Sequence, residues 1–460
     1  MTHLPGRKRS WLFLRALVAG LLAGFGGWSP TVVGPGQGVG EARAAEAPTG
    51  RCRIAWGRAL ADVPVSEGLR LGGLSDLGAA RGCGPDRWWA ITDRGPNGIV
   101  ERDGEKLRTL IAPDFTPSLV LLHIDPVAGR NNSIAVERIL PLDGPKGHPL
   151  TGLPTGGPGH LPVLSADGTA ELSPDPDGVD PEAVVQLPDG TLWIAEEYGP
   201  SLLKVGPDGR AIERHVPVGI ATDAAAVPHR ETLPAAYARR LDNRGFEALA
   251  AEPDGARLWV LLQSPLDNPA KKARKTGNVR LLGFDPVAGR PTAEHLYRLG
   301  DPGDRDYLTK GAAPDDGKLC AMALLDQGQL LVLEQDDAGL ARLYAVMLDG
   351  ATDTLPWLPG SDESKTLEEI RDLPAAGIVP VRKRLVADLA SLRETMAAQA
   401  DGGRQLHGPL KLEGIAIVDE RHVLVANDDD FGVHGDGPRR RRSFAWLLEL
   451  EQPLAASAAK

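Results

Sequence analysis

The sequence predicts an all-β fold, a β-propeller of about six blades. Its 460 residues include 55 glycines and 39 prolines but only 7 phenylalanines, which is typical of a turn-rich β protein. A module of two short apolar strands joined by a turn rich in Asp and Gly recurs along the chain. Irregularly spaced hairpins of this kind indicate propeller blades. Five copies are visible, at residues 72–98, 180–209, 243–267, 318–337 and 411–432.

Two segments outside these modules also indicate internal duplication. LHIDPVAGR at 122–130 and LGFDPVAGR at 282–290 are nearly identical and read as an outer strand followed by a turn. A sandwich fold is a weaker interpretation, because it does not explain why one polar position recurs at the start of equivalent strands.

Residues 361–400 differ from the rest of the chain. The stretches TLEEIRDL and KRLVADLASLRETMAAQA have helical apolar spacing and contain good helix formers. We therefore expect a small helical insertion here, packed on the last blades.

The N-terminus predicts export. Three basic residues at positions 7–9 precede an apolar run over about residues 11–28, and Ala-Arg-Ala at 42–44 has the pattern of a cleavage site. A membrane anchor is the alternative, but an arginine and several glycines interrupt the run. We expect a signal peptide at 1–44 and a single domain at 45–460. The protein would then be periplasmic or secreted, with no stable membrane anchor after cleavage.

The charge balance favours metal cations over nucleic acid as partners. Without residues 1–44 the chain has 46 basic and 61 acidic residues, a net charge of −15. Such an acidic surface argues against nucleic acid. Clustered carboxylates are compatible with divalent cations, which hold them together. The basic stretch KKARK at 271–275 reads as a solvated part of an insertion.

Three cysteines are present, Cys52, Cys83 and Cys320. An exported protein can form disulfides, and we expect Cys52 and Cys83 to pair, which would leave Cys320 unpaired. Three cysteines are too few for a disulfide scaffold or a cysteine-based zinc site.

One polar position recurs in register at the start of the modules. Glu182, Glu247 and Glu413 each stand directly before three small or apolar residues. Cys320 occupies this place in a fourth copy, and Ser75 or Asp76 occupies it in the remaining one. The second strand of each module ends on another polar residue: Asp93, Glu196, Gln263, Glu334 or Asn427.

In a propeller these positions would meet at one mouth of the central channel, because the start of one strand and the end of its antiparallel partner lie together. Carboxylates gathered there repel one another, and a hard cation with oxygen ligands relieves the repulsion. The alternative is a set of solvated strand ends, which stays open above all for the Asp428–Asp430 run. We predict a calcium site with the ligands Asp93, Glu182, Glu196, Glu247, Glu413, Asn427 and Asp428.

The modules together resemble the phytase-like domain family, described as esterase-like activity of phytase. The resemblance rests on GGLSDL (72–77), WWAITDRGPNG (88–98) and the later modules quoted above, and it spans nearly all of the chain after residue 44. It implies an exported β-propeller that hydrolyses phosphate esters or other esters. Cys320 and Ser75 depart from the Glu of the other copies, so we expect no metal ligand from those two blades.

A calcium cluster of this kind can bind and polarise a phosphate ester and supply the attacking water. Arg94 and Arg244 are the residues predicted to hold the phosphoryl oxygens, and Glu197 is assigned to the catalytic group with them. Ion pairs with neighbouring acids are the alternative role for each arginine. The sequence has no G-x-S-x-G elbow, P-loop or H-E-x-x-H motif.

Two other functions remain open. Calcium-dependent lactonases of the gluconolactonase type also hold calcium in a propeller channel and hydrolyse carbon esters. A propeller stabilised by calcium could instead bind a ligand or protein without catalysis. The expected partner of the enzyme is a small-molecule ester or phosphate ester.

Overall fold

The computed structural model divides into two compact units, Met1–Glu46 and Ala47–Lys460, and the described residues all belong to the second. They run from 50 to 454, with gaps at 67, 103, 127–132, 158–159, 270–275, 301–316, 327, 338, 357–364, 404–409 and 434–439. The predicted signal peptide and the KKARK stretch lie outside the described residues. Within them, no helix is long and apolar enough to cross a membrane.

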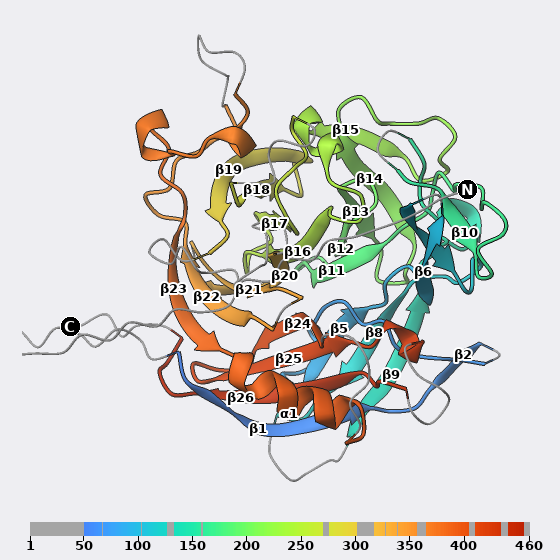
Figure 1. The fold of residues 1–460 in the computed structure, drawn as a ribbon, viewed down its shortest axis with the longest axis horizontal. Coiled ribbons are helices and arrows are strands. Elements are labelled where there is room, and N and C mark those ends of the chain that lie inside the picture. The colour runs from blue at the N-terminus through green and yellow to red at the C-terminus, as the bar shows by residue number, and fades with distance from the viewer. Residues whose placement is uncertain are drawn as a thin grey trace, which may run out of the picture. The chain divides into compact units, whose positions relative to one another are not determined.

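Most of the described chain forms β-strands (Figure 1). Five groups of strands are built on the repeated modules. We number them from the N-terminus as blades 1 to 5, and their strands from the inside outwards are as follows. Blade 1 has β4 (Gly78–Ala79), β5 (Arg87–Ile91), β8 (Ser118–His123) and β9 (Ser133–Pro141). Blade 2 has β11 (Pro181–Gln186), β12 (Leu192–Glu196), β13 (Ser201–Val205), β14 (Ala211–Pro217) and β15 (His229–Leu233).

The remaining three blades have four strands each. Blade 3 has β16 (Phe246–Ala251), β17 (Leu258–Leu262), β18 (Asn278–Asp285) and β19 (Arg290–Arg298). Blade 4 has β20 (Lys318–Asp326), β21 (Gln329–Gln335), β22 (Ala341–Met347) and β23 (Arg382–Asp388). Blade 5 has β24 (Lys411–Ile417), β25 (His422–Asp428), β26 (Phe444–Leu450) and β1 (Cys52–Leu60).

The other elements are short. Two small sheets are formed by β2 (Pro64–Ser66) with β3 (Leu69–Arg70), and by β6 (Asn97–Arg102), β7 (Glu105–Leu110) and β10 (Val163–Ser165). The α-helix is α1 (Ala390–Ala400). The 3-10 turns are η1 (Pro145–Gly147), η2 (Ala235–Arg239), η4 (Leu367–Glu369), η5 (Pro374–Ala376) and η6 (Asp430–Gly432).

The innermost strands of the five blades form a closed ring. Strand β4 contacts β11, which contacts β16, and the series continues through β20 and β24 back to β4 (Figure 1). This closure confirms the predicted all-β propeller. The described residues contain five blades in the ring, so the predicted number of about six is not confirmed.

Blade 5 joins the two ends of the described chain. Its three inner strands come from residues 411–450, and its outermost strand is β1, which pairs antiparallel with β26 from Cys52↔Leu450 to Ala59↔Phe444. Strand β1 also makes a short parallel contact with β9, at Ala59↔Ser133. Blades 5 and 1 are therefore hydrogen-bonded into one eight-stranded sheet.

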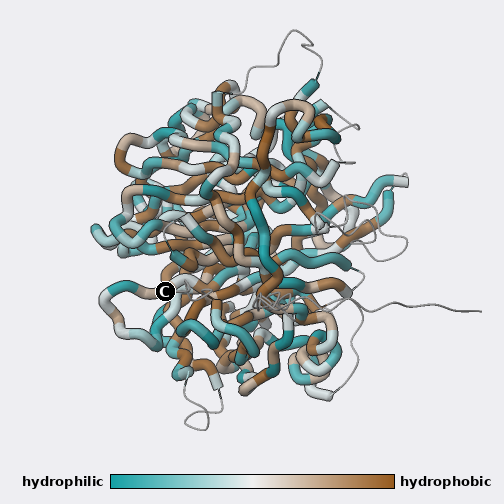
Figure 2. Tube along the Cα trace, turned by 90° about the vertical axis from the view of Figure 1, so that its left-hand side faces the viewer, coloured by the Kyte–Doolittle hydropathy of each residue, from teal (hydrophilic) through white to brown (hydrophobic). Residues whose placement is uncertain are grey.

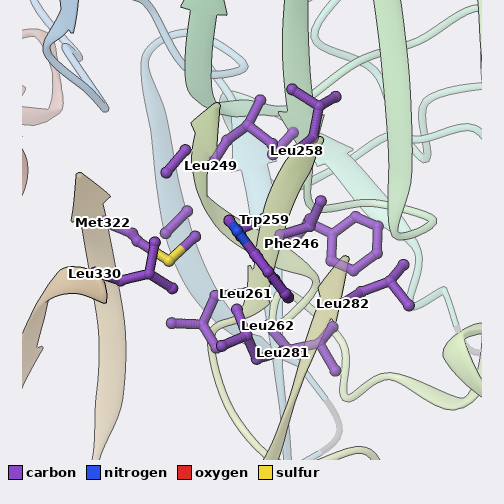
Figure 3. Close-up of a cluster of buried hydrophobic side chains, with 14 of the residues drawn as sticks. Phe246, Leu249, Leu258, Trp259, Leu261, Leu262, Leu281, Leu282, Met322 and Leu330 are labelled. Atoms are coloured by element: carbon purple, nitrogen blue, oxygen red, sulfur yellow. The ribbon is translucent and has the colours of Figure 1, made fainter. Parts of the chain in front are cut away.

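The hydrophobic core lies between the blades. One large cluster packs residues of blade 3 against blades 2 and 4, and Figure 3 shows Phe246, Trp259 and Met322 within it. Separate clusters fill the spaces between blades 4 and 5, 5 and 1, and 1 and 2. Figure 2 shows the resulting mixture of hydrophobic and hydrophilic stretches along the trace. Each blade is therefore buried on both faces, which suits strands with near-continuous apolar runs.

The predicted helical insertion at 361–400 is only partly helical. Residues 382–388 form strand β23, the outermost strand of blade 4, and the α-helix begins at Ala390. The sequence KRLVADL places apolar residues at spacings that fit either structure. Pairing with β22 decides for the strand.

The predicted disulfide between Cys52 and Cys83 is not formed. All three cysteines are free thiols. Cys52 begins β1 in blade 5, whereas Cys83 is exposed in the turn between β4 and β5 of blade 1. The two residues therefore belong to different blades.

Candidate functional site: a buried acidic centre

The recurring polar position is a β-bulge in four blades. The pairing register shifts between Pro181 and Ala183 in β11, and the same shift occurs at the equivalent place in β16, β20 and β24. The extra residue in each strand is the one singled out by the sequence repeat: Glu182, Glu247, Cys320 or Glu413. A bulge re-aims the side chain of the extra residue. The bulges therefore explain why four blades present this position in a common direction.

These side chains converge on one acidic centre. The charge of Glu182 interacts with those of Glu247 and Glu413, although the three residues come from three different blades. Cys320, from a fourth blade, also interacts with Glu247 and Glu413. Glu182, Glu247 and Cys320 are buried, and Glu413 is half-buried.

Three carboxylates lie close enough to share one ion. Asp180, Glu182 and Glu197 each offer an oxygen atom, and these atoms lie within 4.8 Å of one another. All three side chains are buried. Opposite ligands of calcium stand about 5 Å apart, since each lies 2.3–2.6 Å from the ion. The spacing of the three oxygens therefore fits such an ion.

Two polar atoms at this centre have no hydrogen-bond partner among the described residues. They are Oε1 of Glu197 and Oε2 of Glu247, both inaccessible to solvent, and the charges of these two residues interact. Buried polar groups are ordinarily paired, so unpaired oxygens of neighbouring carboxylates indicate a missing partner. The donor set consists of hard oxygen atoms, which suits calcium or magnesium better than a softer metal.

Burial and mutual repulsion raise the pKa values of the central acids. Burial raises the pKa of Asp180 to about 8, even though Arg94 lowers it. Burial, followed by the charges of Asp180 and Glu247, raises the pKa of Glu182 well above its usual range. Burial likewise raises the pKa of Glu247, with Glu197 as the next cause. A bound cation would offset both costs.

Arg94 clamps the acidic centre from one side. Its Nη2 atom lies 2.5 Å from Oδ2 of Asp180 and 3.0 Å from Oε2 of Glu197. Its Nη1 atom donates to Oδ1 of Asn243 at 2.5 Å. Its guanidinium also lies 5.2 Å from the ring centre of Tyr198. Arg94 therefore has a fixed position beside two of the three carboxylates that could hold an ion.

The local sequence NRGFE, residues 243–247, explains how blade 3 comes close to Arg94 and Glu197. Asn243 has a left-handed backbone (φ 55°), which asparagine tolerates better than most residues. A side chain on Gly245 would begin 2.1 Å from the carbonyl oxygen of Glu197, so only glycine allows this approach. Two residues later the bulge aims Glu247 at the centre.

Glu196, a predicted metal ligand, already has a full set of hydrogen bonds. Its Oε1 accepts the N–H groups of Asp180 and Tyr198 at 3.2 and 2.8 Å. Its Oε2 accepts the Gly199 N–H at 3.2 Å and the Ser201 hydroxyl at 2.9 Å. This bonding favours a structural role for Glu196, while its neighbour Glu197 faces the centre.

Asn427, another predicted ligand, is also engaged within its own blade. Its Oδ1 accepts the Phe444 N–H at 2.8 Å, and its Nδ2 donates to the carbonyl of Asp428 at 3.0 Å. The ends of the second strands therefore mainly tie neighbouring strands together, whereas the bulges of the first strands face the centre.

Asp93 and Asp428 form a second acidic patch beside Glu413. The charges of Asp93 and Asp428 interact with each other. Burial raises the pKa of Asp428 to about 7. Lys411 lies 3.2 Å from Asp428 and also pairs with Asp430, so part of this negative charge is balanced by the chain itself.

Arg244 and Tyr198 complete the set of residues considered from the sequence. Arg244 is half-buried and its charge interacts with that of Asp337. Tyr198 is buried and its hydroxyl donates to the carbonyl of Gly152 at 2.6 Å, which anchors the loop above it. His434 lies outside the described residues.

Two residues of the centre were not predicted from the sequence, Asp180 and Asn243. Asp180 stands two residues before Glu182 in the conspicuous stretch DPEAVV. Asn243 opens the NRGFE stretch, and an asparagine before Arg-Gly is a signal for a left-handed turn. Neither residue follows the repeat that revealed the bulges, which is why the repeat alone did not identify them.

The fold and the acidic centre agree with a sequence match. The chain matches the phytase-like family, described as esterase-like activity of phytase, over residues 69–431. This protein therefore belongs to the phytase-like family.

Comparisons with individual proteins show more distant likenesses. An uncharacterized secreted protein of Arthroderma benhamiae is 29% identical over 299 residues, which is 56% of each chain, so the match spans little more than half the length of that protein. Among solved structures, the PQQ-bound aldose sugar dehydrogenase of Streptomyces coelicolor is 12% identical, with a TM-score of 0.32 over 88% of this chain and 100% of its own. Streptogramin B lyase is 11% identical, with a TM-score of 0.29 over 86% and 97% of the two chains. Likeness at this level indicates no function.

Proposed function

We propose that this protein is an exported, calcium-dependent hydrolase that acts on phosphate esters. The observation that carries the proposal is the buried group of Asp180, Glu182 and Glu197 with the Arg94 guanidinium fixed against it. Such an arrangement offers a place for a cation and, beside it, a positive group for an anionic substrate. Membership of the phytase-like family supports ester hydrolysis as the reaction class.

In this proposal the ion is held by Asp180, Glu182 and Glu197 of blade 2, with Glu247 of blade 3 and Glu413 of blade 5 near them. Bound calcium would polarise the ester and activate water. Glu196 and Asn427 are not included, because their oxygens are occupied. Asp93 and Asp428 would contribute negative potential from the adjoining patch rather than direct ligands.

The surroundings of Arg94 favour an anionic ester over a neutral one. A cavity of about 70 Å³ on this side is lined by three cationic residues, Arg94, Lys106 and Arg108, and by one acid, Asp242. Burial lowers the pKa of Arg108, and the nearby charge of Arg94 lowers it further. A phosphoryl group would reduce this repulsion between cations, and arginine matches its geometry. Arg94 would bind the substrate, while Arg244 is left without an assigned role in this proposal.

Export is the second part of the proposal. A basic and then apolar segment at 1–44, followed by a single domain at 45–460, is the pattern of a secreted or periplasmic precursor. The secreted relative from Arthroderma benhamiae supports the same location.

The test is hydrolysis of p-nitrophenyl phosphate by the purified protein, with calcium and after treatment with a chelator. We expect activity with calcium, loss of activity after chelation, and recovery when calcium is returned. Turnover of a lactone but not of the phosphate ester would replace this proposal with a calcium-dependent lactonase. Binding of calcium without turnover of either ester would instead indicate a non-catalytic binding protein.

A further inference from the structure

A larger cavity lies next to the acidic centre. It has a volume of about 330 Å³ and is bordered by strand β14, the start of β15, turn η2 and the loop around Thr155. Glu196 and Tyr198 form the wall that it shares with the acidic centre. The proposed hydrolysis does not use this cavity.

Two residues that line this cavity carry donors without a partner. Arg214 and His229 are paired across the parallel strands β14 and β15. Nε of Arg214 and Nε2 of His229 are both inaccessible to solvent and have no hydrogen-bond partner among the described residues. The Thr222 N–H donates to Nδ1 of His229 at 3.3 Å, so the neutral ring carries its hydrogen on Nε2. Both atoms are therefore donors that lack an acceptor.

The positive charge of Arg214 is not balanced by a salt bridge within the described chain. Its side chain is 1% exposed, and its two Nη atoms donate to the carbonyl oxygens of Gly178 and Asp177 at 2.9 and 3.2 Å. The Asp177 carboxylate instead accepts the N–H groups of Ala226 and Val227. Arg214 is thus held by neutral carbonyl groups, and no acid forms a salt bridge with it among the described residues.

A second arginine of the cavity has the same kind of anchor. Arg240 donates through Nε to the carbonyl of Tyr198 and through Nη1 to that of Leu241, and its Nη2 lies 3.2 Å from the ring nitrogens of His160. Burial lowers its pKa, and the charges of Asp242, Glu197 and Glu196 offset this only in part. A salt-bridge distance of 4.0 Å to the half-exposed Asp242 offers only weak balance.

One acid, Glu196, lines the same cavity, and it does not compete for these donors. Both of its carboxylate oxygens are filled by the four hydrogen bonds given above. The cavity therefore contains two arginine charges, an unpaired imidazole N–H and a carboxylate that is already satisfied. Buried donors and charges in this state require an acceptor.

We propose that this cavity binds an oxyanion, the phosphate or carboxylate group of a small molecule, between Nε of Arg214 and Nε2 of His229. Charge-assisted hydrogen bonds from these two atoms fix the anion, and Arg240 adds positive potential from the facing wall. The site is separate from the ion site of the acidic centre. It does not depend on whether the protein hydrolyses esters.

The test is isothermal titration of the metal-stripped protein with inorganic phosphate and, separately, with acetate. The protein is first dialysed against a chelator and then against chelator-free chloride buffer. His229→Phe keeps a ring but removes the donor. Thr222→Glu places a carboxylate on the exposed rim of the cavity, and Ala224→Glu adds the same charge two residues away, at an exposed position that does not line it.

We expect saturable binding of at least one anion with one site per chain. His229→Phe and Thr222→Glu should each weaken it about tenfold or more, and Ala224→Glu should leave it nearly unchanged. Binding of phosphate alone would identify a phosphate site, and binding of both would identify a general oxyanion site. Absence of saturable binding, binding that needs added calcium, or equal affinity in all variants would overturn the proposal.

Discussion

The inward direction of the central acids has a simple local cause. One extra residue in an otherwise regular strand turns a side chain that would lie between blades toward the centre, and blades 2, 3 and 5 place a glutamate there. The same place in blade 4 holds Cys320, whose pKa burial raises well above its usual range. A buried thiol in that state is a poor metal ligand, since the thiolate is the binding form.

Glu182→Gln should have opposite effects on metal binding and on the metal-free protein. It removes one anionic ligand, so calcium affinity should fall at least about tenfold, in the range of a lost charged hydrogen bond. It also removes a carboxyl group whose pKa is raised by folding, so the cost of protonating or burying that group disappears and the free energy of unfolding without metal should rise. Calorimetric titration with calcium and denaturant unfolding measure the two effects. Glu171→Gln, at an exposed residue, is the control, and equal calcium affinity in both variants would contradict the ligand assignment.

Arg94→Lys should lower kcat/KM on a phosphate ester by about 100-fold, the scale of losing one preorganised electrostatic contact. Lysine keeps the charge, but one ammonium group cannot reach Asp180, Glu197 and Asn243 together. Steady-state kinetics on both proteins checks this. A variant with unchanged kinetics would show that Arg94 is only a structural ion pair.

Helix α1, in the insertion between blades 4 and 5, contributes to the hydrophobic core. Helix α1 places Met396 and Ala400 in the cluster between blades 4 and 5. Arg393 of the same helix donates to the carbonyls of Asp336, Leu340 and Leu410, so it joins the two blades through their backbones. The helix therefore holds blades 4 and 5 together through apolar packing and hydrogen bonds.

Met396→Ala should lower the free energy of unfolding by about 2–5 kcal/mol, because it removes a fully buried side chain and leaves a cavity. Glu394→Ala, two residues earlier on the exposed side of α1, should change it by no more than about 0.5 kcal/mol. Denaturant unfolding of both variants gives the comparison. Similar losses in the two would mean that the helix does not pack as described.

The repeated hairpin module was the basis for most of the predicted fold and site residues. It located Glu182, Glu247 and Glu413, because a periodic fold turns equal positions into neighbours. It could not separate Glu196 from Glu197, because the repeat marks only where β12 ends, and the hydrogen bonds that occupy Glu196 come from residues that do not follow the repeat. Asp180 and Asn243 depend on contacts between blades, which have no period in the sequence. Strand β23 was assigned to a helix because its apolar spacing fits both structures.

Considered as a whole, the molecule concentrates negative charge at its centre and positive charge beside it. The acids come from several blades around the ring, and Arg94, Arg108, Arg214 and Arg240 stand on the side of blades 1 to 3. Such separation of charge is costly in the empty protein. Bound ions of opposite sign in the two regions would offset that cost.

Calcium should raise the melting temperature more at about pH 8 than at about pH 5. Folding raises the pKa of Asp180 to about 8 and of Asp428 to about 7 from ordinary values near 4. Between these limits the folded chain holds more protons than the unfolded one, so the metal-free protein loses stability as pH rises. Calcium competes with those protons and binds better at high pH. Thermal unfolding with and without calcium at both pH values measures this; a larger shift at the lower pH would contradict a cation site among these acids.

The pairing of β1 with β26 has a consequence for biogenesis. Cys52 and Leu450 are partners in the same sheet, so β1, the first strand of the described chain, completes its blade only when β26, the last described strand, has been made. Until then β1 has only its short contact with β9, so its other edge is open and can pair with other chains. Contacts between such distant residues also form slowly. The newly made polypeptide is therefore prone to aggregate with other copies of itself until this pairing has formed.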